Sequence, residues 1–206
     1  MGLKERRQRH KDEFKAEILE AALALFVQEG YNGFSMRKLA SRIEYSPTTI
    51  YLYFRDKDDL LLHICENFYA NLLQEQLQGM TADAPPEQHL RQAFLCYVSY
   101  SLKHPELYKV VFFSNPQLYG RPEDYLSRDT MSLRCWKQFC ELVDNCIKSG
   151  YFRHLDCYTL STVLWSAMHG LVTSTIFTKD FPMPDPAIMT EMMLDGIFSG
   201  YRADHS

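Results

Sequence analysis

Residues 34–57 read FSMRKLASRIEYSPTTIYLYFRDK, and this stretch decides the fold. Ser35 precedes one run of helix-forming residues, and Ser46 with Pro47 precedes another. Serine is favoured as the residue that caps a helix N-terminus, and proline is favoured at the first helical position. The stretch therefore predicts two short helices joined by a tight turn, followed by a third helix that Asp56 caps.

The second short helix separates a buried face from an exposed face. At about 100° per residue, Ile50 and Phe54 point together into a small core. Thr48, Thr49 and Leu52 point the other way, and Tyr51 and Tyr53 lie on the flanks. A helix that is held by one face and presents hydrogen-bonding side chains on the other is the layout of a DNA-reading helix-turn-helix.

The residue types on the free face suit contacts with DNA. Threonine can hydrogen-bond a base edge or a phosphate, and Leu52 could touch a thymine methyl group. The hydroxyls of Tyr51 and Tyr53 have the reach of phosphates, and Lys57 adds attraction to the backbone. Arg37, in the first short helix, could reach a guanine edge or a phosphate. The alternative is that the tyrosines are half-buried packing residues and the threonines ordinary surface residues.

The rest of the chain also reads as helix, and the expected fold is all-α with about nine helices. Alternating apolar runs are absent, so no sheet is expected. The first helix runs to about Gln28, with Gly30 as its C-cap. The other helices are expected at about 36–43, from 47, and at 57–78, 87–103, 105–112, 123–149, 156–177 and 185–200. We expect a DNA-binding domain at 1–57, with its helix-turn-helix at about 35–54, and a larger helical domain at 58–206.

Bulk composition is that of an ordinary soluble protein, 46% hydrophobic and 23% charged over 206 residues. No apolar run reaches the roughly 18 residues of a membrane span, and the charged N-terminus does not resemble a signal peptide. We therefore expect a cytoplasmic protein without a membrane partner. Residues 1–57 carry 11 Lys+Arg and 8 Asp+Glu (+3), which leaves 11 and 18 (−7) for the remainder. This asymmetry favours a polyanion partner at the N-terminal end only.

The six cysteines are Cys65, Cys96, Cys135, Cys140, Cys146 and Cys157. None forms a CxxC pair, so the expected state is reduced thiols that pack as small apolar residues, with a redox switch as the alternative. No Cys or His spacing suits zinc, and no nucleophile elbow, P-loop or dinucleotide fingerprint is present. We therefore expect no metal, no cofactor and no enzyme activity.

A basic segment, expected to precede the first helix, occupies residues 1–11. It carries Lys4, Arg6, Arg7, Arg9 and Lys11. One interpretation is a solvated tail. The other is an arm that follows the DNA backbone or enters the minor groove.

From about residue 18 to residue 61, the sequence resembles the N-terminal domain of the tetracycline-repressor (TetR) family. The matching pieces are ILEAALALFVQEGYNGFSMRKLASRI and SPTTIYLYFRDKDDLL, with the characteristic pattern YxYFxxKxxLL from Tyr51 through Leu61. The resemblance implies an all-helical homodimer whose C-terminal domain binds a small effector. The DNA-contact residues expected from the residue chemistry and the resemblance together are Ser35, Arg37, Ser46, Pro47, Thr48, Thr49, Tyr51, Leu52, Tyr53 and Lys57.

One residue departs from the family pattern. The turn between the two short helices usually carries glycine, whereas this chain has Glu44. A non-glycine residue can adopt the left-handed conformation at a cost of about 1 kcal/mol. We therefore expect the turn to be kept, and the negative charge to weaken binding to the DNA operator.

The C-terminal helices have broad apolar stripes, which indicates that more than one side is buried. The resemblance implies a dimer interface made by the last two helices, at about 156–177 and 185–200, with Gly170 allowing close approach. The run WSAMHG, residues 165–170, resembles a Trp-x3-His-Gly pattern of some of these domains.

An effector pocket is expected among the fourth to eighth helices, from the helix at 57–78 to the helix at 156–177. The candidate lining residues are Tyr97, Tyr100, Phe112, Phe113, Trp136, Met168 and His169. Core packing is the alternative for each of them, and a hydrogen bond to a buried carbonyl is the alternative for His169. Their composition favours an apolar or aromatic effector with one or two polar anchors.

The sequence thus predicts a DNA-binding transcriptional regulator that binds a palindromic operator as a homodimer and is released by a small hydrophobic effector. Its two recognition helices would have to lie about 34–36 Å apart, and a ligand would alter that spacing through the helix at 57–78. The alternative is a DNA-binding architectural protein with no effector.

Overall fold

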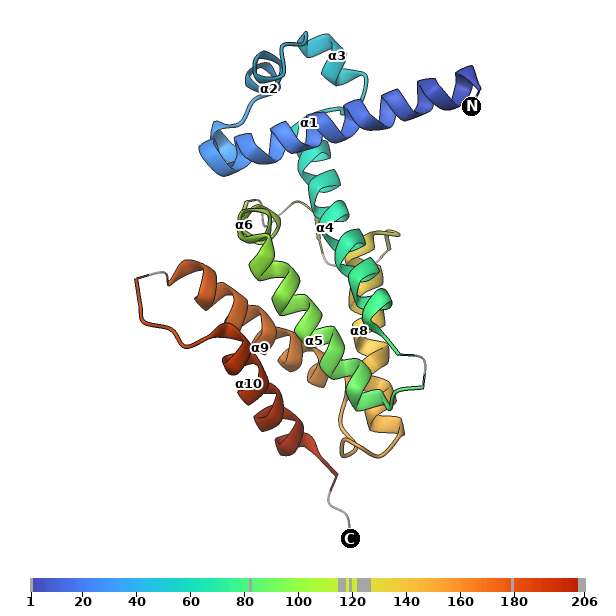
Figure 1. Cartoon of the computed structure of the whole chain (residues 1–206), viewed down its shortest axis with the longest axis vertical. Helices are drawn as coiled ribbons and strands as arrows, with labels where there is room; N and C mark the ends of the chain where they lie inside the picture. Colours follow the sequence, from blue (N-terminus) through green and yellow to red (C-terminus); the bar gives the residue numbers. More distant parts are fainter. Residues whose placement is uncertain are drawn as a thin grey trace. The chain divides into compact units, whose positions relative to one another are not determined.

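The computed structural model describes residues 2–81, 83–114, 118, 120–121, 127–178 and 180–203. Within these ranges the chain forms nine helices and no strand, which confirms the all-α prediction (Figure 1). The helices are α1 (Leu3–Gly33), α2 (Met36–Arg42), α3 (Pro47–Tyr51), α4 (Lys57–Gly79), α5 (Pro86–Lys103), α6 (Pro105–Phe113), α8 (Met131–Lys148), α9 (Cys157–Phe177) and α10 (Pro186–Tyr201).

The chain separates into two compact units. The first, the reading unit, contains Met1–Phe68 and Glu106–Arg128; the second, the C-terminal unit, contains Tyr69–Pro105 and Asp129–Ser206. The division falls inside α4, between Phe68 and Tyr69.

The core of the reading unit is built from one apolar stripe of each helix. Ile18 and Ala22 of α1, Leu39 of α2, Ile50 of α3 and Leu60 of α4 are all fully buried. Burying a large aliphatic side chain contributes roughly 1.5–3 kcal/mol, so these contacts hold the short helices α2 and α3 in place.

The end of α1 differs from the prediction of a C-cap at Gly30, because the helix continues to Gly33 and Gly30 forms a kink within it. Gly30 has a φ of 68°, a conformation that glycine adopts without strain, and the carbonyl of Gly30 accepts a hydrogen bond from the N–H of Phe34 at 3.2 Å. This bond turns the chain out of the helix and toward α2.

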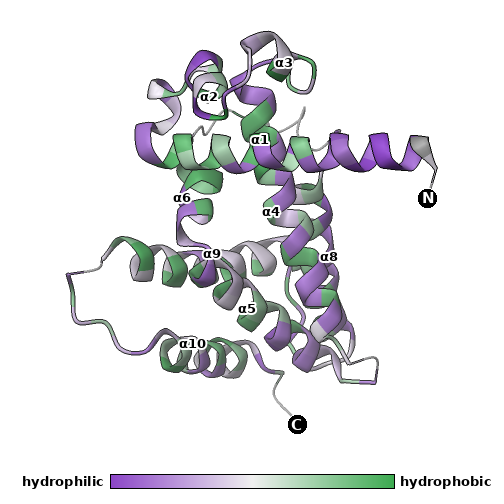
Figure 2. Cartoon of the chain, turned by 45° about the horizontal axis from the view of Figure 1, so that its top comes forward, coloured by the Kyte–Doolittle hydropathy of each residue, from purple (hydrophilic) through white to green (hydrophobic). Residues whose placement is uncertain are grey.

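The start of α1 differs from the prediction. The basic residues at 1–11 do not precede the helix but form its first turns, because α1 begins at Leu3. Figure 2 shows these turns as strongly hydrophilic. Side-chain pairs four residues apart stabilise exposed helix turns: Arg9 pairs with Glu13 at 3.2 Å, and Gln8 donates to Asp12 at 2.8 Å.

Three predicted caps around the helix-turn-helix are confirmed. The Ser35 hydroxyl accepts from the N–H of Lys38 at 3.3 Å, and the Ser46 hydroxyl accepts from the N–H of Thr49 at 3.1 Å. The Asp56 carboxylate accepts from the N–H of Asp59 at 2.8 Å at the start of α4. Each cap satisfies a backbone donor that the helix itself leaves unpaired.

In the C-terminal unit, α5 packs against α8 and α9, and α10 packs against α9 and α5. Arg91 of α5 forms ion pairs with Glu191 and Asp195 of α10. Two backbone bonds fasten the end of α10 to the loop after α8: Arg153 N–H donates to the Tyr201 carbonyl and Ala203 N–H to the Tyr151 carbonyl, both at 3.0 Å.

The predicted start of the helix at 123–149 is wrong. Residues 123–126 lie outside the described residues, and residues 127–130 are not helical. The helix, α8, begins at Met131 because the Thr130 hydroxyl caps it, accepting from the N–H of Leu133 at 3.2 Å.

Among the described residues, α9 is the one helix with the length and apolar composition of a membrane span. Core helices of soluble proteins share these properties, and here α5, α8 and α10 all pack on α9.

Candidate nucleic-acid interface

The turn between α2 and α3 is closed by backbone hydrogen bonds. Glu44 has a φ of 58°, so it takes the predicted left-handed conformation without being glycine. The next residue, Tyr45, donates its N–H to the carbonyl of Ala40 at 3.0 Å. The bond fixes the orientation of α3 relative to α2. Glu44 itself is exposed, so its carboxylate lies on the surface of the turn.

The segment from Pro47 to Phe54 separates into two faces as the helical wheel predicts. Although α3 itself ends at Tyr51, Phe54 keeps the helical spacing, since its N–H donates to the carbonyl of Ile50 at 3.0 Å. Ile50 and Phe54 are 0% and 1% exposed, whereas Leu52 and Tyr51 are 77% and 53% exposed. Thr48 is also exposed. These exposed side chains are free to contact a macromolecular partner, whereas Ile50 and Phe54 hold the segment on its core.

Other predicted contact residues have a structural role in the first turn of α3. The Ser46 and Thr49 hydroxyls lie 2.9 Å apart and bond to each other, and Pro47 is half-buried at the first helical position. Ser46 is therefore committed as a cap, with its lone pairs partly used. It orients Thr49 rather than presenting a free hydroxyl.

Tyr53 lies half-buried after the end of α3. Its ring packs edge-on against Phe14 of α1, with 5.2 Å between ring centres, and the ammonium of Lys11 lies 6.0 Å from its ring centre. Half-buried packing, the alternative given for the tyrosines, applies to the Tyr53 ring but not to the exposed Tyr51.

Lys57, at the start of α4, contacts Tyr31 near the end of α1. Its ammonium lies 3.9 Å from the centre of the Tyr31 ring and donates to the Tyr31 carbonyl at 3.3 Å. The hydroxyl of Tyr31 in turn donates to the carboxylate of Asp58. An ammonium has three donors, so Lys57 can hold Tyr31 and still donate to a phosphate. No sequence pattern predicts this contact, because Tyr31 and Lys57 are far apart along the chain.

Asp59 is an ionised carboxylate in the first turn of α4. Burial works against its ionisation, but the backbone N–H of Arg55, 2.9 Å away, and the nearby His63 outweigh it and hold the pKa of the Asp59 carboxyl below its usual value. The resulting carboxylate suits the positive end of the α4 dipole.

In α2, Ser35 serves as the cap, and Arg37 is exposed without an ion pair or hydrogen bond among the described residues. The neighbouring Lys38 is engaged: it forms an ion pair with Glu29 and donates to the Gly33 carbonyl at 3.0 Å. The third cation of α2, Arg42, donates to the side-chain oxygen of Gln28 at 2.6 Å, so Arg37 has the guanidinium most available to an anionic partner.

Replacing Glu44 by glutamine is expected to raise affinity for operator DNA about fivefold for each reading helix that contacts the DNA. The change removes one negative charge per reading helix and leaves the shape of the side chain unchanged, and a nearby unit charge contributes about 1 kcal/mol in water. Fluorescence anisotropy at constant salt measures the effect, with Glu20→Gln on α1 as the charge-matched control. Equal affinities for the Glu44→Gln variant and the parent would show that this carboxylate lies away from the DNA.

The predicted effector residues divide between the two units. Tyr97, Tyr100 and Met168 are buried and Trp136 is half-buried in the C-terminal unit. Phe112 and Phe113 belong to the reading unit, where Phe112 packs on Tyr108 with 4.7 Å between ring centres. All seven residues remain a prediction as effector contacts.

The structure brings two of these residues into contact. The Tyr97 hydroxyl and His169 Nδ1 lie 3.2 Å apart, and the Trp165 ring stacks on His169 with 4.8 Å between centres. Burial lowers the pKa of His169, which favours a neutral ring. On α5, one turn after Tyr97, the fully buried Ser101 hydroxyl has no hydrogen-bond partner among the described residues. The sequence prediction missed Ser101, whose signal is a serine within an apolar helix face.

The six cysteines are free thiols. Burial raises the pKa of Cys96 to about 11 and that of Cys146 to about 12, so both thiols are protonated at neutral pH. Protonated thiols are poor nucleophiles, in keeping with a packing role.

Comparison with known proteins agrees with this geometry. Residues 18–64 match the family model described as bacterial regulatory proteins of the tetR family, and residues 90–197 match the model of the tetracyclin repressor-like C-terminal domain.

Curated relatives cover part of the chain. The HTH-type transcriptional repressor NicS of Pseudomonas putida is 29% identical over 104 residues, which are 50% of this chain and 49% of that protein. The probable HTH-type transcriptional regulator YttP of Bacillus subtilis is 30% identical over 101 residues, 48% of each chain. The chain thus spans about half the length of these curated relatives.

Solved structures share the fold over nearly the whole chain. The fatty acid degradation regulator FadR of Bacillus halodurans has a TM-score of 0.77 at 18% identity, covering 92% of this chain and 97% of its own. A TetR family regulator of Marinobacter aquaeolei has a TM-score of 0.73 at 22% identity, covering 96% and 100%. The helix-turn-helix geometry and the two family matches lead to one conclusion: this chain belongs to the tetR family of bacterial regulatory proteins.

Proposed function

We propose that the protein is a ligand-responsive repressor that binds a palindromic operator as a homodimer and is released by a small hydrophobic effector. The observation that carries the DNA-binding part is the division of residues 47–54 into a buried face, at Ile50 and Phe54, and an exposed face, at Tyr51 and Leu52. Repression is favoured by the likeness to NicS, although FasR of Mycolicibacterium smegmatis, 26% identical over 102 residues, is described as an activator.

Within this proposal, Thr48 and Leu52 face base edges, while Tyr51, Tyr53, Lys57 and Arg37 bind phosphates. Ser35, Ser46, Pro47 and Thr49 set the geometry of the helix ends, which also bring backbone N–H groups toward the DNA. Residues 1–57 carry these contacts, and residues 58–206 carry effector binding and dimerisation. The protein acts in the cytoplasm, without a membrane partner or a catalytic role.

Dimerisation through α9 and α10 is supported by exposed apolar side chains on both helices. These are Tyr158, Val163, Phe177, Ile188 and Met192, exposed by 43–71%. A Cβ added at Gly170 or Gly196 would meet open space. Because neither glycine has a side chain, a second helix could approach the backbone closely at these two positions. Apolar side chains that gather on neighbouring helices mark a protein interface.

The basic turns of α1 extend the proposed DNA-binding surface. At about 100° per residue, Lys4, Arg7, Lys11 and Lys15 lie within roughly 80° of arc, on the side where α1 meets the reading helices. The ammonium of Lys11 lies over the Tyr53 ring, and that of Lys15 lies 5.5 Å from the centre of the Phe54 ring. Lys4, Arg7, Lys11 and Lys15 therefore form a basic face of α1 that begins beside Tyr53 and Phe54. A phosphate backbone that follows this basic face would meet no acidic side chain within the same arc.

The opposite side of the same turns provides a control. Arg6 and Arg9 lie there together with Glu13, Glu17 and Glu20, and Arg9 is paired with Glu13. Its two cations are thus accompanied by carboxylates, which makes this side a poor phosphate-binding surface.

Exchanging Arg7 and Lys11 for glutamine is expected to weaken operator binding about tenfold or more and to make the logarithmic salt dependence shallower by about 1–2 per protomer. Arg6→Gln with Arg9→Gln, which changes net charge equally, is expected to change both quantities only slightly. Titration by fluorescence anisotropy at several salt concentrations measures them. Equal losses in the two double variants would show that net charge alone is responsible.

Effector release is tested with DNA from upstream of the protein's own gene. Hydrophobic acids, alcohols and aromatic compounds are added to the complex, and release is followed by anisotropy. To change occupancy decisively, an effector must prefer the non-binding conformation by several kcal/mol. If no compound releases the DNA or raises the melting temperature, the architectural alternative is favoured.

A further inference from the structure

Two of the six cysteines lie next to each other in the C-terminal unit, although 17 residues separate them along the chain. Cys140 is near the middle of α8, and Cys157 is the first residue of α9. The thiol of Cys157 donates to the backbone carbonyl of Cys140 at 3.4 Å. The sulfur of Cys157 thus lies against the residue that carries the other thiol.

A single hydroxyl group is a partner of both thiols. Ser161, one turn after Cys157 on α9, is fully buried, and its oxygen lies 3.9 Å from the sulfur of Cys157. The same Ser161 side chain forms a hydrogen bond with the thiol of Cys140. Two thiols that reach one hydroxyl group are close enough to approach each other by rotation of their side chains, which is the movement that a disulfide requires.

The surroundings of the two thiols differ in a way that sets their order of reaction. Burial raises the pKa of Cys140, although the hydrogen bond with Ser161 acts in the opposite direction, and a thiolate at Cys157 would raise it further. The pKa of Lys148 is also raised, mainly by its hydrogen bond to Asp144 and the charge of Asp144, and to a lesser degree by a Cys157 thiolate. The ammonium of Lys148 is therefore near enough to attract that thiolate. Since the thiolate is the nucleophilic form of cysteine, Cys157 is the thiol expected to react first.

Other cysteines have surroundings that suit a packing role. Cys65 and Cys146 are buried, whereas Cys140 and Cys157 are half-buried, so a small oxidant can reach the latter two more easily. Cys135 is half-buried on the same helix as Cys140, but its thiol donates to the carbonyl of a residue on α4 at 3.3 Å. Cys135 therefore provides a matched control for Cys140.

We propose that Cys140 and Cys157 are an oxidation site, at which a hydroperoxide converts the two thiols into a disulfide that joins α8 to the first turn of α9. In a reducing compartment such a bond is transient and reports oxidant, whereas a permanent structural disulfide is rare there. This inference goes beyond the proposed function and does not depend on it.

The reaction takes place in two steps. In the first, the Cys157 thiolate attacks one oxygen of hydrogen peroxide: an S–O bond forms, the O–O bond breaks, and the released hydroxide takes up the proton that the Cys157 thiol lost, leaving as water. In the second, the sulfur of Cys140 attacks the sulfenic sulfur of Cys157: the S–S bond forms, the S–O bond breaks, and the hydroxide leaves as water with the proton of Cys140. The two thiols together lose two electrons and two protons, and the peroxide is reduced to two molecules of water.

The disulfide would fasten the start of α9 to α8. In the reduced protein, the Asp156 carboxylate caps this end of α9 by accepting from the N–H of Thr159 at 2.7 Å. A covalent link between Cys140 and Cys157 would close the loop that connects the two helices and so restrict the unfolded chain. We expect oxidation to raise the melting temperature by about 3–6 °C.

The test uses the full-length protein without DNA, reduced, freed of reductant and then treated with a small excess of hydrogen peroxide. Titration of thiols in denaturant should show the loss of two of the six thiols per chain, and dithiothreitol should restore them. Digestion with trypsin and a glutamate-specific protease separates Cys140 from Cys146, because Glu141 lies between them. Mass spectrometry should then find peptide 138–141 linked to peptide 154–179.

Single variants separate the two steps. Cys140→Ser should leave a sulfenic acid on Cys157 that dimedone traps, because the second thiol is missing. Cys157→Ser should be labelled much more slowly, because burial disfavours the thiolate of Cys140. Neither variant should lose two thiols or gain thermal stability on oxidation. The control Cys135→Ser should still lose two thiols.

A reversible disulfide between Cys140 and Cys157, absent from both single variants and present in the control, would support the site. Retention of all six thiols would overturn the site, and a disulfide to another cysteine, or between two chains on a non-reducing gel, would overturn the pairing. Dimedone labelling of Cys140 in preference to Cys157 would overturn the order of the steps. A disulfide that forms without raising the melting temperature would overturn its effect on α9. Because no DNA is present, none of these failures bears on the proposed repressor function.

Discussion

Glutamate introduced at both Met192 and Gly170 is expected to leave a folded monomer that binds operator DNA at least about 100-fold more weakly than the parent. Met192 is 71% exposed on α10, and a Cβ added at Gly170 of α9 would meet open space. Neither substitution therefore disturbs the core. In the proposed dimer, both place charge where apolar side chains meet, and an unpaired buried charge costs several kcal/mol.

The loss of DNA affinity follows from the loss of two-site binding. A dimer that occupies one half-site binds the second as an intramolecular step, which raises overall affinity by about 10²–10⁴. Light scattering after size exclusion gives the oligomeric state, and anisotropy gives the affinity. The control is Leu77→Glu on α4, which adds the same charge at another exposed apolar position. A Met192/Gly170 variant that stays dimeric and binds operator normally would rule out the interface on α9 and α10.

Removing the single hydroxyl of Tyr51 is expected to have the second large effect. Tyr51 is 53% exposed beside the buried Ile50, so Tyr51→Phe changes a surface group and leaves the packing of α3 intact. A hydrogen bond to a charged group contributes about 1.5–3 kcal/mol, and the dimer would lose two such bonds. Operator affinity should therefore fall about 100-fold or more, while the melting temperature stays within about 1 °C.

A second tyrosine in the same region is the matched control. Tyr45 is 45% exposed in the turn, and its ring packs on Phe14 with 4.5 Å between centres. Tyr45→Phe should leave operator affinity nearly unchanged, because no phosphate contact is assigned to it. If the two variants bind DNA equally well, Tyr51 is not a phosphate ligand.

Local signals in the sequence predicted the fold and the shape of the reading helix. The caps at Ser35, Ser46 and Asp56 and the turn at Glu44 depend on residues within a few positions of one another. The buried pair Ile50 and Phe54 follows from helical periodicity alone. Such short-range features are visible in a single sequence because the chemistry that causes them is itself local.

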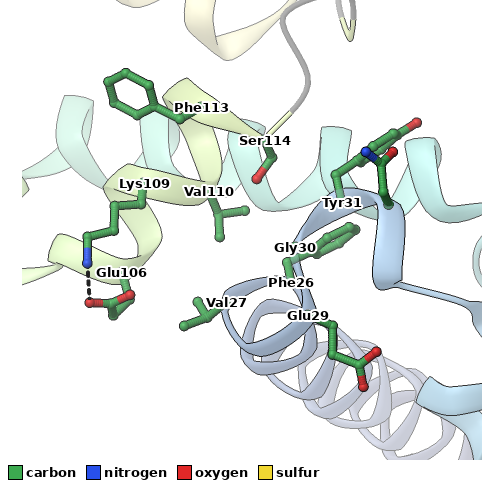
Figure 3. A pocket seen from close by; sticks show the side chains of 11 residues that line it. Phe26, Val27, Glu29, Gly30, Tyr31, Glu106, Lys109, Val110, Phe113 and Ser114 are labelled. Atoms are coloured by element: carbon green, nitrogen blue, oxygen red, sulfur yellow. Dashed lines mark hydrogen bonds and ion pairs between the residues drawn. The ribbon is translucent and has the colours of Figure 1, made fainter.

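Features that depend on distant contacts were not predictable in this way. The cation–π contact between Lys57 and Tyr31 and the ion pair between Glu29 and Lys38 join residues that only the tertiary fold brings together. The start of α1 was missed because a charged segment at a chain terminus resembles a solvated tail, although pairs such as Arg9 and Glu13 were in the sequence. No sequence motif predicts the cavity of about 340 Å³ between α1 and α6 (Figure 3), because its lining comes from two separate segments of the chain.

The most direct test of the central claim is selection of binding sites from random double-stranded DNA with the full-length protein. The account predicts enrichment of an inverted repeat whose half-site centres lie about one helical turn, or a whole multiple of it, apart. It also predicts that affinity for the selected site falls steeply with salt and that Tyr51→Phe abolishes the enrichment. Recovery of no common sequence, or of an unpaired half-site with the same affinity, would contradict it.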